Sequence, residues 1–200
     1  MFYETRENRH GLAHDPFKAI VAPRPIGWIG TRAADGRFNL APYSFFTAIS
    51  DVPKMVMFSS SGRKDSVRNI EETGVFTASV AGHALAEPMN TSSKPLPHGE
   101  SEFAHAGLTP VMGQLIEAPF VGEAYAALEC RATELFQPKT LAGTLSDNHV
   151  VIAEVVGIHI REEAIRDGRF DMAMVRPLGR LGYMDYCDAG DVFEMMRPGR

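Results

Sequence analysis

Short runs of β-branched and aromatic residues, separated by turn residues, dominate the first third of the chain. They predict strands at Lys18 to Ala22, Ile26 to Arg32, Arg37 to Leu40, Ser44 to Ser50 and Lys54 to Phe58. An Asp-Gly pair at Asp35 and Gly36 lies between the second and third runs. Because both residue types accept positive φ angles, this pair predicts a tight hairpin turn.

The strand-like pattern returns later in the chain, at Val75 to Ala81, Ala124 to Phe136 and His149 to Ile160. A second Asp-Gly pair, Asp167 and Gly168, predicts another hairpin before a strand at Arg169 to Val175. Methionines alternate with other residues along two of the predicted strands and are expected in the core: Met55, Met57, Met172 and Met174.

Helical patterning is sparse. One helix is expected to begin at Asp65 or Ser66, either of which suits an N-cap, and to stop at Gly74, which suits the position after the last turn. One or two helical turns are expected at each of His83 to Met89 and Ser101 to Ala106. Asn90 to Glu100 holds two prolines, a glycine and small polar residues, which predicts a long loop.

The count reaches roughly eight strands with little helix between them, which favours a closed β-barrel over an alternating α/β sheet. No GxGxxG motif follows a predicted strand, so a dinucleotide-binding doubly wound fold is not indicated. The 200 residues, 44% hydrophobic and 22% charged, suit one globular domain over residues 1–200.

The net charge of -5 offers no broad basic field, so neither nucleic acid nor an anionic membrane is an expected partner. No segment approaches the ~18 apolar residues of a membrane span, and the first residues lack a signal-peptide core. The two cysteines, Cys130 and Cys187, are far apart and form no CxxC pair. A reducing, cytoplasmic setting is therefore expected.

The segment Ser59 to Ser66 carries the groups that a phosphate monoester requires. Three serine hydroxyls, a glycine, Arg63 and Lys64 arrive together beside the N-terminus of the predicted helix, whose free N–H groups suit an anion. The spacing is not that of a P-loop. The same residues also fit a solvated, serine-rich turn with a helix cap.

The segment Asn39 to Phe46 mixes amide, hydroxyl and aromatic groups around Pro42. Such a corner suits a flat heteroaromatic ligand such as an isoalloxazine ring, whose edges are polar and whose faces are apolar. Alternatively, Tyr43 and its neighbouring phenylalanines belong to the core. Arg24 stands between two prolines and faces either an anionic ligand or a surface carboxylate.

The seven histidines show no HExxH spacing, so no metal site is expected. His149, at the start of a predicted strand, is a candidate for placing a nicotinamide, but a capping or core role fits it better.

In the order and spacing of several motifs, the sequence resembles the flavin reductase-like FMN-binding split barrels, which include reductase components of two-component monooxygenases and flavoredoxins. The motifs are Arg24 to Thr31, Asn39 to Phe46, Ser59 to Ile70, Glu102 to Thr109, Ala127 to Cys130 and Leu178 to Tyr183. The resemblance implies a mainly β fold, a six-stranded Greek-key split barrel with a few short helices. It also implies a homodimer with flavin mononucleotide (FMN) near the subunit interface.

Carried over by position, the resemblance gives each part of the flavin a set of residues. It implies that the phosphate is held by Ser59, Ser61, Arg63 and Lys64. It implies that the ring is lined, largely through backbone groups, by Asn39, Pro42, Tyr43 and Ser44. Further candidates are Arg24 and Thr31, together with a loop holding Asn90, Thr91 and Ser92 that closes over the flavin or comes from the second subunit.

The function implied is an NAD(P)H-dependent flavin reductase that passes electrons to free flavin or to a partner monooxygenase. Because the flavin itself carries the redox chemistry, no catalytic side chain is expected. An FMN-containing electron carrier without nicotinamide activity is the alternative. A barrel that holds haem or a pyridoxal-type phosphate in the same groove is a third interpretation.

Overall fold

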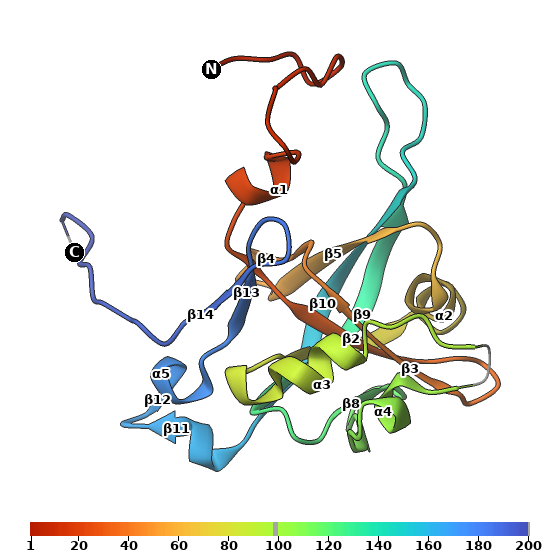
Figure 1. Ribbon diagram of the computed structural model, residues 1–200. Coiled ribbons are helices and arrows are strands. Elements are labelled where there is room, and N and C mark those ends of the chain that lie inside the picture. Colours follow the sequence, from red (N-terminus) through yellow and green to blue (C-terminus); the bar gives the residue numbers. More distant parts are fainter. Residues whose placement is uncertain (98–99, 200) are drawn as a thin grey trace.

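The computed structural model describes residues 1–97 and 100–199 (Figure 1). Its centre is an antiparallel sheet of seven strands in the order β3-β2-β6-β9-β10-β5-β4 within these residues. The strands are β2 Gly27–Arg32, β3 Phe38–Tyr43, β4 Phe46–Ser50, β5 Met55–Ser61, β6 Val75–Val80, β9 Ala126–Phe136 and β10 Asn148–Ile160. The prediction of a mainly β fold with a few short helices is confirmed.

Smaller elements surround the central sheet. The short strands are β1 Arg24–Pro25, β7 Pro110–Met112, β8 Pro119–Val121, β11 Ile165–Arg166, β12 Arg169–Phe170, β13 Leu178–Arg180 and β14 Tyr186–Asp188. The helices are α1 Phe17–Ile20, α2 Asp65–Thr73, α3 Ala86–Thr91, α4 Glu102–His105 and α5 Met172–Val175, with 3₁₀ turns at His83–Leu85 and Glu162–Ala164. No helix in the described ranges is both long and apolar enough to cross a bilayer.

The central sheet curls into a half-barrel whose two edges are β3 and β4. These edge strands follow each other in sequence, yet in the described part of the chain no ladder joins them. The expected closed barrel is therefore open along one seam. Pro42 lies in the edge strand β3. Proline has no N–H group to donate to a neighbouring strand, so it is tolerated at the edge of a sheet.

Strand β2 is buried on both of its faces. Trp28 and Ile29 are fully buried and belong to two different apolar clusters, one with Leu40 and Phe103, the other with Phe58. Because successive side chains of a strand point to opposite faces, β2 separates these two clusters. Because β2 lies between the two clusters and pairs with β3, it fixes the position of this edge strand.

Both predicted hairpins form, with different turns. In the first, Gly36 has a φ of 92°, and its N–H donates to the carbonyl of Ala33 over 2.9 Å. Asp35 is absent from the residues with positive φ, so this is a longer turn than the two-residue type. In the second, Asp167 and Gly168 both have positive φ, at 51° and 72°, which is the two-residue turn that the Asp-Gly pair predicts. This turn joins the short strands β11 and β12, whereas the strand expected before it, β10, pairs with β5 and β9.

The helix expected after Ser66 forms as α2 and ends as predicted. Gly74 adopts a φ of 73°, and its N–H donates to the carbonyl of Ile70 over 2.8 Å. Its N-cap is Lys64, whose side chain does not cap it, rather than Asp65 or Ser66. Those two residues form the first turn instead.

Two predicted strands are wrong. The run Lys18 to Ala22 overlaps the short helix α1. Ile20 is 73% exposed there, so this apolar residue is not buried in a sheet. Only Arg169–Phe170 of the run to Val175 is a strand, because Asp171 caps α5 by accepting a hydrogen bond from the Met174 N–H.

The methionines expected in the core do not lie there. Met172 and Met174 are 40% and 37% exposed, while Met55 and Met57 are half-buried on the face of β5 opposite Val56. The expected loop from Asn90 to Glu100 is also shorter at its start, because Asn90 and Thr91 close α3. His98 and Gly99 of that loop lie outside the described residues.

Candidate functional site

A cavity of about 610 Å³ opens beside the seam of the half-barrel. Its walls come from β3 and the corner that follows it, the end of β5, the start of α2 and the segment after α3. Among the predicted site residues it brings together Asn39, Pro42, Tyr43, Ser44, Ser59, Ser61, Arg63, Lys64 and Ser92. A cavity of this volume is within the range of small-molecule and cofactor sites.

The charge of this cavity is opposite to that of the whole chain. Its described lining includes five cationic side chains, Lys18, Arg63, Lys64, Arg68 and Lys94, and two carboxylates, Asp65 and Glu102. The adjoining cavity, about 480 Å³, is lined by five carboxylates and two guanidinium groups. An anionic group is therefore drawn to the first cavity although the chain carries a net charge of -5.

The serines before the helix are positioned by a strand. β5 runs through Ser61, so Ser59 and Ser61 lie on one face and Ser60 on the other. Ser60 is fully buried, and its hydroxyl donates to the carbonyl of Gly62 over 2.8 Å. Gly62, at a φ of 81°, then turns the chain in a conformation that favours glycine. Only two of the three serine hydroxyls therefore face the cavity.

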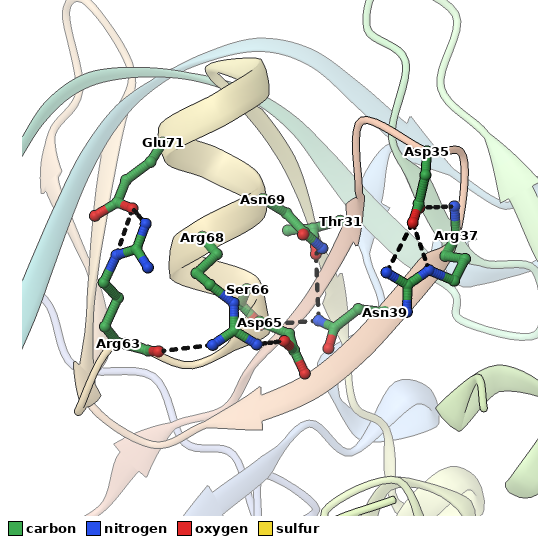
Figure 2. A network of polar contacts seen from close by, with 10 residues as sticks. All are labelled: Thr31, Asp35, Arg37, Asn39, Arg63, Asp65, Ser66, Arg68, Asn69 and Glu71. Carbon is green, nitrogen blue, oxygen red and sulfur yellow. Dashed lines mark hydrogen bonds and ion pairs between the residues drawn. The ribbon is translucent and has the colours of Figure 1, made fainter. Parts of the chain in front are cut away.

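A buried polar network joins this start of α2 to the sheet (Figure 2). The Asn39 amide nitrogen donates to Ser66 Oγ over 2.9 Å and to Thr31 Oγ1 over 3.2 Å. The Asn69 amide nitrogen donates to the same Thr31 hydroxyl over 2.9 Å. Thr31 is fully buried and does not line the cavity. It instead ties β2, β3 and α2 together beneath it.

The two arginines near the helix start are both held by carboxylates of α2. Arg63 Nε and Nη2 lie 2.7 and 2.5 Å from Glu71 Oε2, and Glu71 raises the pKa of this guanidinium. Figure 2 shows the Arg63 side chain running along the helix toward Glu71, away from Ser66. Arg68 contacts Asp65 and donates to the Arg63 carbonyl over 3.4 Å.

The hydroxyl of Tyr43 has no hydrogen-bond partner among the described residues, although it is buried. The ring packs 4.9 Å from that of Phe58, and the residue is 8% exposed. Burial raises the pKa of the Tyr43 hydroxyl, and the nearby hydroxyls of Ser66 and Ser60 offset part of the rise. Because buried polar groups are nearly always paired, this hydroxyl is an exception among the described residues.

Two of the remaining predicted residues lie elsewhere. Arg24 is 7% exposed, and its guanidinium donates to the backbone carbonyls of Lys18, Val21 and, over 2.9 Å, Leu181. Burial, followed by the nearby Arg180, lowers its pKa. Arg24 thus holds the segment that carries Lys18 to the cavity. Asn90 lines a different cavity, beside His83 and Tyr186.

His149 lies outside the lining of the 610 Å³ cavity and is paired with Ser60 in the ladder between β10 and β5. Within the described ranges, no group of three or more His, Cys, Asp or Glu side chains is placed to hold a metal ion.

Sequence reasoning did not single out four polar residues that line the cavity, namely Lys18, Arg68, Ser93 and Lys94. A signal existed for Arg68, because a residue three positions after Asp65 on a helix shares its face. Lys18 and Lys94 come from distant segments, and no local pattern predicts that they meet.

Comparisons with known proteins give the family of the chain. The model of the family "Flavin reductase like domain" matches residues 21–182. An uncharacterised protein of Deinococcus radiodurans is 36% identical over 192 residues, covering 90% of this chain and 82% of that protein.

Two solved structures have a fold similar to that of this chain. Nitrilotriacetate monooxygenase component B from Bacillus cereus is 27% identical, with a TM-score of 0.88 and 98% of each chain covered. A protein from Shewanella frigidimarina, described as a flavin reductase with a split barrel domain, has a TM-score of 0.80 over 98% of this chain and 93% of that chain. At 23% identity it shows the fold alone, and the split-barrel prediction is confirmed.

Proposed function

This chain belongs to the flavin reductase-like family, and from that premise we propose that it binds FMN and reduces it with NADH or NADPH. The observation that carries the proposal is the cationic cavity beside the seam. It combines five cations and two serine hydroxyls with the Pro42 corner of an edge strand. A flavin monophosphate requires both kinds of surface, a charged end and a flat, partly apolar slot.

The residues present fit FMN. Ser59, Ser61 and Lys64 would hold its phosphate, with Arg63 and Arg68 within the same lining. The backbone of β3 and the following corner, at Asn39, Pro42 and Ser44, would line the ring. Tyr43 also lines this corner, and its ring packs 4.9 Å from that of Phe58.

Bound FMN would supply the hydride and single-electron chemistry, so the protein needs only to hold, orient and shield it. The buried contacts of Thr31 fix Asn39 and, through it, Ser66 at the start of α2. Orientation of the two reactants by such fixed groups supplies much of the rate in reactions of this kind. No acid–base pair is required of the side chains.

Anaerobic mixing tests this activity. Purified protein with FMN and excess NADH or NADPH should lose the flavin absorbance near ~450 nm. A protein that binds FMN but leaves the band unchanged would be an electron carrier of the flavoredoxin kind, reduced by a protein partner. A colourless protein that fails to bind added FMN would refute the proposal, and a Soret band would indicate haem instead.

The proposal also covers the oligomeric state of the protein and its cellular compartment. We place the protein in the cytoplasm, as a homodimer that passes electrons to free flavin or to a partner oxygenase. The similarity to a monooxygenase component supports the electron acceptor, and the two free cysteines, Cys130 and Cys187, suit a reducing compartment. Light scattering of the purified protein tests the dimer, and co-purification from the native host tests the partner.

A further inference from the structure

The guanidinium of Arg63 is held outside the cavity that its side chain lines. Glu71, which accepts two contacts from it, is not part of that lining. Figure 2 also shows Arg68 paired with Asp65 of the same helix, but Asp65 does line the cavity. In the described part of the chain, no ion pair is found for Lys64 or Lys94, so the two arginines are the cavity's carboxylate-bound cations.

Both ion pairs are open to solvent and therefore easily exchanged. The side chains of Arg63 and Glu71 are 52% and 28% exposed, and those of Arg68 and Asp65 are 44% and 55% exposed. Exposed pairs of this kind are weak, whereas a guanidinium binds a phosphate with two parallel hydrogen bonds. A phosphate arriving in the cavity can thus take over a guanidinium from a carboxylate of α2.

We propose that Glu71 sets the affinity for FMN by competing with the flavin phosphate for the Arg63 guanidinium. The inference rests on the proposed function, because it assumes that the cavity binds FMN. Glu71 is then an internal counter-ion that FMN must displace, and it weakens FMN binding by the cost of breaking one exposed ion pair. Riboflavin, which has no phosphate, gains nothing from Arg63 and is indifferent to Glu71.

The test is the dissociation constant of FMN and of riboflavin for wild type and Glu71→Gln, measured by flavin fluorescence at low ionic strength. Glu71→Gln should bind FMN about 1.5- to 5-fold more tightly, the range that one exposed ion pair supplies, with riboflavin unchanged. The gain should shrink at high salt, because salt screens exposed charges. In an Arg63→Ala background, Glu71→Gln should give no gain.

Glu72→Gln is the matched control. It removes the same charge from the next residue of α2, and Glu72 acts on Arg63 only through its longer-range field. A gain equal to that of Glu71→Gln would overturn the proposal, as would a gain that persists without Arg63.

Weaker FMN binding by Glu71→Gln would also overturn it, because Glu71 would then support Arg63 in a phosphate-binding position. If the wild type binds FMN and Glu71→Gln binds it no more tightly, this inference alone fails. If the wild type does not bind FMN, the proposed function fails with it.

Discussion

Glu129 is a buried carboxylate outside the 610 Å³ cavity, and its contacts allow its contribution to stability to be worked out. It is 1% exposed in β9, and it accepts hydrogen bonds from the backbone N–H groups of Gln114, Leu115 and Ile116 at 2.7, 2.8 and 3.1 Å. His159 Nε2 lies 2.6 Å from Glu129 Oε1, the oxygen that also accepts from Gln114. Glu129 therefore holds the turn between β7 and β8 against the sheet.

The expected cost of Glu129→Gln is about 2 to 4 kcal/mol in the free energy of unfolding. Hydrogen bonds to a charged group contribute about 1.5 to 3 kcal/mol each, and a glutamine turns an amide N–H₂ toward some of these donors. Gln114 and Leu115 are exposed residues and their bonds to Glu129 are part-buried, so losing each of them costs less than losing a fully buried bond. Ile116 is buried, and its N–H group and the His159 contact account for most of the loss.

The contribution of Glu129 to the stability of the fold should depend on pH in one direction. Burial raises the pKa of the Glu129 carboxyl, but the N–H groups and His159 outweigh it, so the pKa lies below its ordinary value of 4.5. A carboxyl with a lowered pKa stabilises the fold fully above the unfolded pKa, and that stabilisation disappears as the pH falls through the folded pKa. The difference between wild type and Glu129→Gln should therefore be constant near neutrality and shrink below about pH 4.5.

Urea unfolding at several pH values measures both effects. Glu134→Gln, an exposed substitution on the same strand, is the control and should change stability by less than about 0.5 kcal/mol. A loss below about 1 kcal/mol for Glu129→Gln, or a difference that grows in acid, would refute the reasoning. Its FMN affinity should match that of wild type, because Glu129 does not line the 610 Å³ cavity.

Three further predictions concern other buried groups. Thr31→Val removes the hydroxyl that accepts from Asn39 and Asn69. It should lower the free energy of unfolding in urea by about 1 to 3 kcal/mol and weaken FMN binding, and unchanged values for both would contradict the positioning role. Ser92→Ala leaves the indole N–H of Trp28, 2.9 Å from Ser92 Oγ, without its partner, and the emission of this single tryptophan should report a similar loss of stability. Burial raises the pKa of the Cys130 thiol to about 12, so iodoacetamide at pH 8 should label only Cys187 in the folded protein and both thiols in urea, as counted by mass spectrometry; rapid labelling of folded Cys130 would refute its burial.

The sequence predicted those elements whose signals are local. The end of helix α2 followed from Gly74, and the turn of the second hairpin from Asp167 and Gly168. The strand expected at Lys18 to Ala22 failed because apolar residues there remain exposed in α1. Local pattern shows what a segment is suited to, whereas burial depends on neighbours that are distant in sequence.

In the candidate site too, the sequence predicted what a local segment specifies and missed what depends on distant residues. Ser59, Arg63 and Lys64 were predicted from one short segment, and the structure places all three in one cavity. The direction of the Arg63 guanidinium could not be predicted, because it depends on the ion pair with Glu71, eight residues further along the chain. Lys94 reaches the cavity from a loop, which no periodicity describes.

The most direct test of the central claim, that this cavity binds the phosphate of FMN, compares two flavins. The dissociation constants of FMN and riboflavin are measured for wild type and for the double variant Arg63→Ala with Lys64→Ala. The account predicts that the double variant weakens FMN far more than riboflavin, since each lost charge-assisted contact costs about 1.5 to 3 kcal/mol. Equal weakening of both flavins would contradict it and make this segment a structural turn.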